Sequence, residues 1–123
     1  MSSLDVEPQP LGQETVGTTP VLIYTVPAVS PDSGLTVKSA TIRKINAANL
    51  KSTPGRVRVW IVPPSGTPDD STVLMPDLIV PENGVGWDDG ITVINAGGEI
   101  WGSGDSVDAF TITVSGALTV VVP

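Results

Sequence analysis

The chain has 123 residues, a length that fits one domain with a hydrophobic core. It contains neither Cys nor His, which excludes a disulfide framework, a thiolate nucleophile, a zinc-thiolate site and histidine as general base or metal ligand. No signal-peptide pattern opens the chain, and no apolar run approaches the ~20 residues that span a bilayer. We therefore expect a soluble, unprocessed protein, and the missing Cys is compatible with synthesis in a reducing cytoplasm.

Charge is unevenly distributed along the chain. All six basic residues lie within residues 38–58, a stretch without Asp or Glu, and the rest of the chain carries all 13 acidic residues. The net charge of −7 therefore comes from a basic segment set in an acidic background. Opposed single-sign surfaces attract a complementary surface and fix its orientation. The pattern indicates docking rather than catalysis.

The N-terminal segment differs in composition from the rest of the chain. Residues 1–18 contain Pro, Gly and acidic residues without apolar periodicity. We expect them to form an extended N-terminal arm over or beyond the domain, and residues 19–123 to form a β-sandwich domain. The 13 Gly and 12 Pro, beside many Thr and Val residues, suit short strands joined by tight turns, so we predict no helix.

Two strands are predicted after the arm. Val21 to Val26 is a β-branched and aromatic run closed by Pro27. Leu35 to Asn46 is a longer run whose apolar positions change parity twice: Val37, Ala40, Ile42 and Ile45. A regular strand cannot keep one buried face across such changes, so we predict a bulge or break within this strand.

The clearest amphipathic strand is predicted at residues 56–61, where two sets of side chains alternate: Val57, Val59 and Ile61 against Arg56, Arg58 and Trp60. Shorter strands are predicted between turn signals further along: Thr72 to Leu74, Leu78 to Val80, Ile91 to Ile94 and Glu99 to Trp101. Each of these runs is bounded by Gly, Pro, Asn or Asp, which favour turns.

The C-terminal residues suggest a hairpin of Phe110 to Val114 and Leu118 to Val122. A three-residue loop, Ser115 to Ala117, sets apolar side chains opposite each other, whereas a two-residue loop sets them opposite Thr and Ser. We therefore predict the three-residue loop. About eight antiparallel strands without repeats indicate an all-β fold, a compact antiparallel β-sandwich of jelly-roll type, with an immunoglobulin-like sandwich as the alternative.

Several segments resemble small β-sandwich accessory virion proteins of tailed bacteriophages: Leu22 to Ala28, Val37 to Asn46, Trp60 to Pro63 with Ser65-Gly66, Ala96 to Trp101 and Phe110 to Gly116. The similarity spans residues 20–118 and involves structural motifs without a catalytic signature. The resemblance implies a non-enzymatic subunit added to a phage particle, as a head decoration or cement protein or a neck or tail component. It also implies a homo-oligomer, often a trimer.

An enzymatic or metal site has little support in the sequence. The acid pairs Asp69-Asp70 and Asp88-Asp89 lie in turn sequences, where Asp caps backbone amides. The run Gly102 to Asp108 has oxygen ligands without the spacing of an EF-hand loop. We expect no enzyme activity, catalytic residue, cofactor or metal. Nucleic acid is also disfavoured as a partner, because the acidic residues repel a polyanion.

The predicted interface consists of the basic segment and one aromatic residue: Lys38, Arg43, Lys44, Lys51, Arg56, Arg58 and Trp60. We expect these residues to share one sheet face that meets acidic side chains, on an adjacent copy or on the particle. Arg56 and Arg58 are favoured because Arg binds carboxylates through two parallel hydrogen bonds. A solvated face without a partner remains the alternative.

The three Trp residues are assigned separately. Trp60 opposes the apolar face of its strand, so it lies in an interface or covers the second side of the sheet. For Trp87 and Trp101 we predict packing in the core, because large aromatic side chains are highly buried on average.

The resulting hypothesis is a capsid decoration or cement protein on the outer surface of a phage virion, made in the host cytoplasm, which bridges neighbouring subunits. The partners expected are further copies of the chain and the major capsid protein or other virion subunits, with no membrane. A tail-associated or host-surface carbohydrate-binding module is the alternative, and an undetected hydrolase ranks third.

Overall fold

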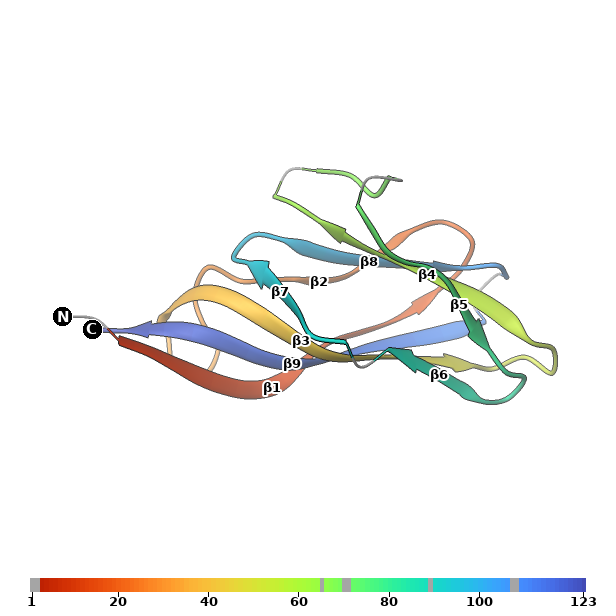
Figure 1. The fold of residues 1–123 in the computed structure, drawn as a ribbon, viewed down its shortest axis with the longest axis horizontal. Helices are drawn as coiled ribbons and strands as arrows, with labels where there is room; N and C mark the ends of the chain where they lie inside the picture. Colours follow the sequence, from red (N-terminus) through yellow and green to blue (C-terminus); the bar gives the residue numbers. More distant parts are fainter. Residues whose placement is uncertain (1–2, 65, 70–71, 89, 107–108) are drawn as a thin grey trace.

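The structure is a computed structural model that describes residues 3–64, 66–69, 72–88, 90–106 and 109–123, and none of these residues is helical. Two antiparallel sheets pack face to face (Figure 1). Sheet A has the order β1-β9-β3-β6, and β7 also pairs with β3; sheet B has the order β2-β8-β4-β5. The strands are β1 (Ser3–Val16), β2 (Val21–Thr25), β3 (Thr36–Asn49), β4 (Gly55–Val62), β5 (Val73–Val80), β6 (Val85–Asp88), β7 (Thr92–Asn95), β8 (Glu99–Gly104) and β9 (Phe110–Val122).

This strand order is that of a jelly roll. The first strand pairs with the last, and most connections cross from one sheet to the other. The predicted antiparallel β-sandwich is therefore confirmed, and the order differs from the immunoglobulin arrangement, which was the alternative.

Residues 1–18, expected to form an arm, are extended but belong to the sandwich as far as they are described. From Ser3 to Val16 they form β1, which pairs with β9 along its whole length. β1 is an edge strand, where Pro8 and Pro10 are tolerated because an edge position leaves one side of the backbone unpaired. The start of β1 and the end of β9 lie together at one tip of the molecule (Figure 1).

The irregularity predicted in the second strand is confirmed. The pairing of β3 with β9 shifts between Val37 and Ser39 and again between Ile42 and Lys44. Lys38 and Arg43 are the extra residues at these two β-bulges. The shifts return the apolar side chains of β3 to the inner face after each change of parity.

The predicted C-terminal hairpin is wrong, because β9 is one continuous strand from Phe110 to Val122. Its side chains that pack in the central core keep a single parity: Phe110, Ile112, Val114, Leu118 and Val120. Gly116 lies in mid-strand and is not a turn residue. Its backbone approaches β3 so closely that a Cβ atom there would overlap the carbonyl oxygen of Thr41.

The remaining predicted strands are found with altered ends. The runs from Thr72 to Leu74 and from Leu78 to Val80 join in β5. The run from Glu99 extends to Gly104 in β8, and the run from Ile91 begins one residue later in β7. The short strand β6 was not predicted, since only four residues separate its flanking turn signals.

The core lies between the sheets. Its fully buried side chains come from both inner faces, with Phe110 the largest. The ring of Phe110 occupies the space that side chains at Gly55 and Gly104 would need, and these two glycines lie on β4 and β8 of the opposite sheet. The two missing side chains allow the only Phe of the chain to fill the space between the sheets.

We predict that Gly116→Ala lowers the free energy of unfolding by about 2 kcal/mol or more, because the added methyl group collides with the backbone of β3 rather than with a mobile side chain. Urea unfolding followed by tryptophan fluorescence measures the change. Ser115→Ala, in the neighbouring half-exposed position, is the control and should change stability little. Equal stabilities of both variants would contradict the close packing of β9 against β3.

Candidate functional site

The predicted basic face is divided by the fold. Lys38, Arg43 and Lys44 lie on β3 in sheet A, whereas Arg56 and Arg58 lie on β4 in sheet B. All five side chains are exposed. Because the two sheets pack against each other through their inner faces, their exposed faces point in opposite directions (Figure 1). The expectation that these strands are neighbours in one sheet is therefore corrected.

Lys51 lies in the connection between the two sheets and is anchored. Its Nζ donates a hydrogen bond to Ser106 Oγ at 2.5 Å. The same connection is organised by the buried Asn49, whose Nδ2 donates to the carbonyl oxygens of Thr53 and Val80 at 2.9 and 3.3 Å. Asn49 Oδ1 accepts from the backbone N–H of Lys51 at 2.9 Å. One buried amide thus ties the start of β4 to the end of β5.

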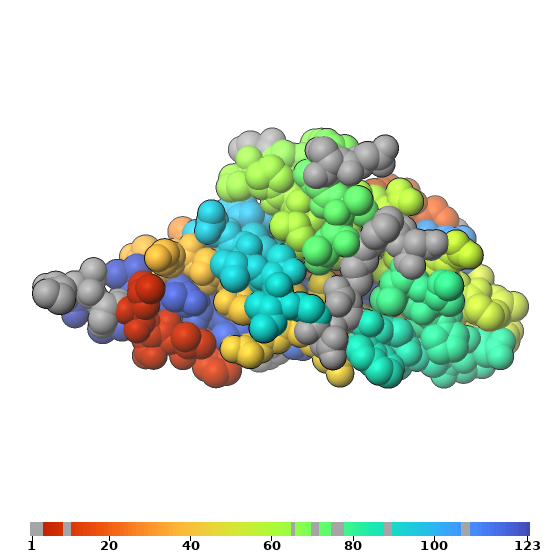
Figure 2. Space-filling model, in the orientation of Figure 1, coloured from red at the N-terminus to blue at the C-terminus, as the bar shows by residue number. Residues whose placement is uncertain are grey.

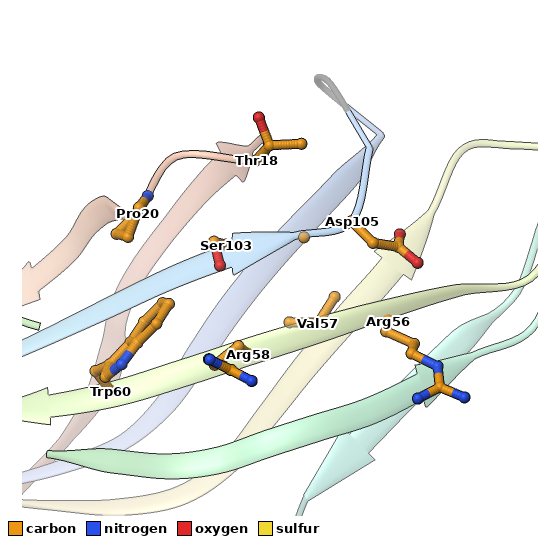
Figure 3. Close-up of a pocket in the computed structure, with 9 residues that line it drawn as sticks. Thr18, Pro20, Arg56, Val57, Arg58, Trp60, Ser103 and Asp105 are labelled. Carbon is orange, nitrogen blue, oxygen red and sulfur yellow. The ribbon is translucent and has the colours of Figure 1, made fainter. Parts of the chain in front are cut away.

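Sheet B carries a shallow groove on its outer face, with a volume of about 430 Å³ (Figure 3). Arg56, Arg58 and Trp60 follow one another along β4 on its outward side, and Ser103 of β8 pairs directly with Arg58. Asp105 follows β8 and donates its backbone N–H to the carbonyl oxygen of Arg56 at 3.1 Å. Thr18 and Pro20 complete the rim, so the groove presents two cations, hydroxyl groups and one carboxylate.

Trp60 covers the second side of sheet B, one of the two positions expected for it. Its side chain is only 7% exposed although it points away from the central core. The guanidinium carbon of Arg58 lies 5.9 Å from the centre of the Trp60 ring, a cation–π contact. Trp101 pairs with Trp60 across the strands and is half-buried, and its Nε1 donates to Glu99 Oε1 at 3.0 Å. Trp60 and Trp101 therefore form an aromatic layer beside the groove.

The prediction that Trp87 and Trp101 pack in the core is wrong, since Trp101 opposes Trp60 on the outer side of sheet B. Trp87 is 56% exposed on β6, and Lys44 Nζ of β3 lies 5.5 Å from the centre of its ring. The alternation of β6 directs Trp87 outward together with Val85, since they pair with Asn46 and Ala48, which lie on the outer side of β3. Sequence reasoning missed this exposure, because β6 was not recognised as a strand.

The outer face of sheet A, which we call the sheet A face, is the second candidate surface. It is identified by pairing, since directly opposed residues share a face. The pairing places one row of residues across the middle of this face: Pro8, Ala117, Thr41 and Val93. Further rows are formed by Val6 with Thr119 and by Trp87 with Asn46 and Thr113. Its exposed large apolar side chains are Leu4, Val6, Val85, Trp87 and Val93. Figure 2 shows β7 and β6 at the surface of the molecule.

The acidic residues give no candidate metal site within the described residues. Asp70, Asp89 and Asp108 lie outside the described part of the chain, and so does the end of the candidate calcium loop, whose first residues belong to β8. In the ranges that are described, no three acidic side chains gather where a metal ion could be held. No helix long and apolar enough to cross a membrane occurs among them.

No protein-family model matches the chain. No curated protein sequence is significantly similar to it.

We predict that Asn49→Ala lowers the free energy of unfolding by roughly 2–3 kcal/mol, because it removes three hydrogen bonds in a buried position and leaves the carbonyl oxygen of Val80 without this donor. Urea unfolding measures the change. Asn46→Ala, on the sheet A face, is the matched control and should cost much less. Similar losses for both variants would contradict the anchoring role of Asn49.

We further predict that Trp87 dominates the quenching of tryptophan fluorescence by acrylamide in dilute protein, since Trp60 is almost fully buried. Trp87→Phe should lower the Stern–Volmer constant far more than Trp60→Phe does. The reverse order would contradict the placement of Trp87 on the exposed face.

Proposed function

We propose that the protein is a non-enzymatic accessory subunit of a tailed-bacteriophage virion, and specifically a head decoration or cement protein. The observation that carries the proposal is the pair of chemically different outer faces on opposite sides of one sandwich. One is the sheet A face, where large apolar side chains are exposed beside Lys38, Arg43 and Lys44, and the other is the sheet B groove with Arg56 and Arg58. A protein that bridges its neighbours needs two such surfaces in a fixed relation.

Each face suits contact with another macromolecule. Apolar side chains gathered on a surface mark interaction sites in soluble proteins, and the sheet A face has five that are large and exposed: Leu4, Val6, Val85, Trp87 and Val93. In the groove, Arg56 and Arg58 stand one residue apart on the same side of β4. This spacing lets two guanidinium groups face neighbouring carboxylates on an acidic partner. We assign the groove to the virion shell.

The mechanism requires no chemistry in the protein. A subunit that binds the assembled shell but not the loose capsid subunits stabilises the shell by mass action. Attachment of several linked copies raises the effective affinity further. The phage assignment draws on the sequence resemblance, and the jelly-roll sandwich is compatible with it because this architecture is common among viral capsid proteins and lectins. The homotrimer that the resemblance implies stays a prediction.

A carbohydrate-binding module on the tail or at the host surface is the second candidate. The groove favours it, since hydroxyl groups, a carboxylate and an aromatic ring are the groups that bind sugars. However, the 7% exposure of Trp60 leaves little ring surface for a sugar to stack on. The particle-binding proposal therefore ranks first.

The proposal is tested by co-sedimentation. Because the chain has no Cys, a Ser52→Cys variant carries a single fluorescent label on an exposed loop outside both faces. The labelled protein is mixed with purified heads of the phage or prophage that carries the gene, and separately with host cells. We expect saturable binding to heads, a higher melting temperature of the shell, and no binding to cells.

A charge-reversed pair of variants locates the attachment. Arg56→Glu with Arg58→Glu should weaken head binding at least about tenfold, because rim and interface charges steer and hold an acidic partner. Lys38→Glu with Arg43→Glu makes the same change of charge on sheet A and should have a smaller effect. Binding to cells or isolated glycans without binding to heads would overturn the proposal in favour of the carbohydrate-binding module.

A further inference from the structure

We propose that Asn83 is a site of spontaneous deamidation, that the folded turn protects it, and that its conversion to isoaspartate loosens the junction between the two sheets. The inference goes beyond the proposed function, because it concerns the chemical lifetime of the folded chain and does not depend on what the protein binds. It rests on the geometry of the turn between β5 and β6 and on the backbone hydrogen bonds of this turn.

The turn between β5 and β6 favours Asn followed by Gly for steric reasons. Pro81 to Gly84 form the turn, and the backbone N–H of Gly84 donates to the carbonyl oxygen of Pro81 at 3.1 Å. Asn83 has a φ of 47°, in the left-handed region, where Asn is found more often than most residues that carry a side chain. A Cβ atom at Gly84 would lie 2.8 Å from Cγ of Pro81. The conformation at residue 83 and the close approach at residue 84 together account for the pair.

This pair is prone to a reaction of its own atoms. The backbone nitrogen of Gly84, once it has lost its proton, attacks Cγ of Asn83. A nitrogen–carbon bond forms, the bond from Cγ to the amide nitrogen breaks, and ammonia leaves with a proton. Water then opens the five-membered succinimide ring at either carbonyl and gives Asp or isoaspartate. The reaction needs no oxidant, reductant or cofactor.

Asn83 is the Asn residue of the chain that is best placed for this reaction. A side chain on the following residue hinders the attack, and the other three Asn residues precede one: Asn46 before Ala47, Asn49 before Leu50 and Asn95 before Ala96. Asn83 is also exposed. In the described part of the chain its side-chain amide makes no hydrogen bond, whereas that of the buried Asn49 makes three.

The fold restrains the attacking nitrogen. Besides the bond from Gly84 to Pro81, the backbone N–H of Asn83 donates to the carbonyl oxygen of Lys51 at 2.9 Å. The backbone N–H of Asn49 donates to the carbonyl oxygen of Gly84 at 2.8 Å. Both residues of the pair are therefore fixed to the end of β3 and the segment that follows it. The nitrogen of Gly84 reaches Cγ of Asn83 only when the turn opens, and local opening costs free energy.

The two products should affect the fold differently. In isoaspartate the main chain runs through the side-chain carbon atoms, so it is longer by one carbon atom at residue 83. The hydrogen bonds of the turn to Asn49 and Lys51 depend on the original spacing. Because Asn49 is buried, a backbone N–H without its partner there is costly. Isoaspartate should therefore destabilise the junction, whereas Asp keeps the ordinary main chain and adds only a negative charge.

The test compares the folded full chain with the chain unfolded in guanidinium chloride, both incubated at mildly alkaline pH. Peptide mass spectrometry follows the replacement of the amide NH2 by OH. We expect Asn83 to react fastest of the four Asn residues in the unfolded chain. In the folded chain its reaction should be at least about tenfold slower, because opening must come first. The Asp89-Gly90 pair can isomerise through the same ring without a change of mass, so the mass gain is specific for Asn.

Two variants separate the reaction from its consequences. Asn83→Gly is the matched control, since Gly adopts positive φ readily and has no amide to lose. It should keep its stability and show no mass gain at residue 83 after the same incubation. Asn83→Asp carries the new carboxylate on an ordinary main chain. The isoaspartate form of aged wild-type protein, isolated by chromatography, should unfold at a lower urea concentration than Asn83→Asp.

Three results would overturn the inference. The first is an unfolded chain in which Asn83 reacts no faster than Asn46 and Asn95, which serve as internal references. The second is an equal rate at Asn83 in the folded and unfolded chains, because the turn would then give no protection. The third is equal stability of the isoaspartate form and Asn83→Asp, because the junction would then not depend on this turn. None of these outcomes depends on head binding.

Discussion

The position of β9 in the middle of sheet A is the constraint on which the inner and outer faces of that sheet depend. β9 pairs with β1 on one side and with β3 on the other, so its alternation sets which side chains of three long strands point inward. Its inner side is apolar from Phe110 to Val120, and its outer side is dominated by Thr and small residues. Because the same strand passes Gly116 without turning, the sheet A face extends without interruption from the start of β1 to β6.

Both neighbours of β9 become irregular close to Gly116. β1 shifts register between Pro10 and Gly12, and β3 shifts between Ile42 and Lys44, opposite Ser115 and its immediate neighbours. Bulges bend a strand and increase its twist. They also add a residue without moving the apolar side chains off the inner face. Arg43 is such an added residue, and this explains how β3 carries a cation between two buried isoleucines, Ile42 and Ile45, without exposing the core.

The alternation of apolar and polar positions predicted the strands well where it was followed consistently along the chain. The two parity changes of β3 predicted its bulges, and the alternation at β4 predicted its inward and outward sides. The same rule would have identified β9 as one strand, since the positions of Phe110 and Leu118 share a parity, but Gly116 was given priority as a turn residue. The role of Gly116 depends on the proximity of Thr41, which is remote in sequence. Local patterns do not contain that information. The exposure of Trp87 was missed because β6 was not recognised as a strand.

The candidate site was harder to predict than the fold, because basic residues that are close in the sequence lie on opposite sides of the folded protein. Lys44 and Arg56 are twelve positions apart, yet the connection between β3 and β4 crosses from one sheet to the other. The basic segment therefore supplies cations to two opposite surfaces instead of one. On sheet A, Lys38, Arg43 and Lys44 are exposed and Lys44 lies against Trp87, whereas on sheet B two arginines line an open groove. Salt should therefore weaken charge contacts at both surfaces, while contacts made by the exposed apolar side chains of the sheet A face should persist.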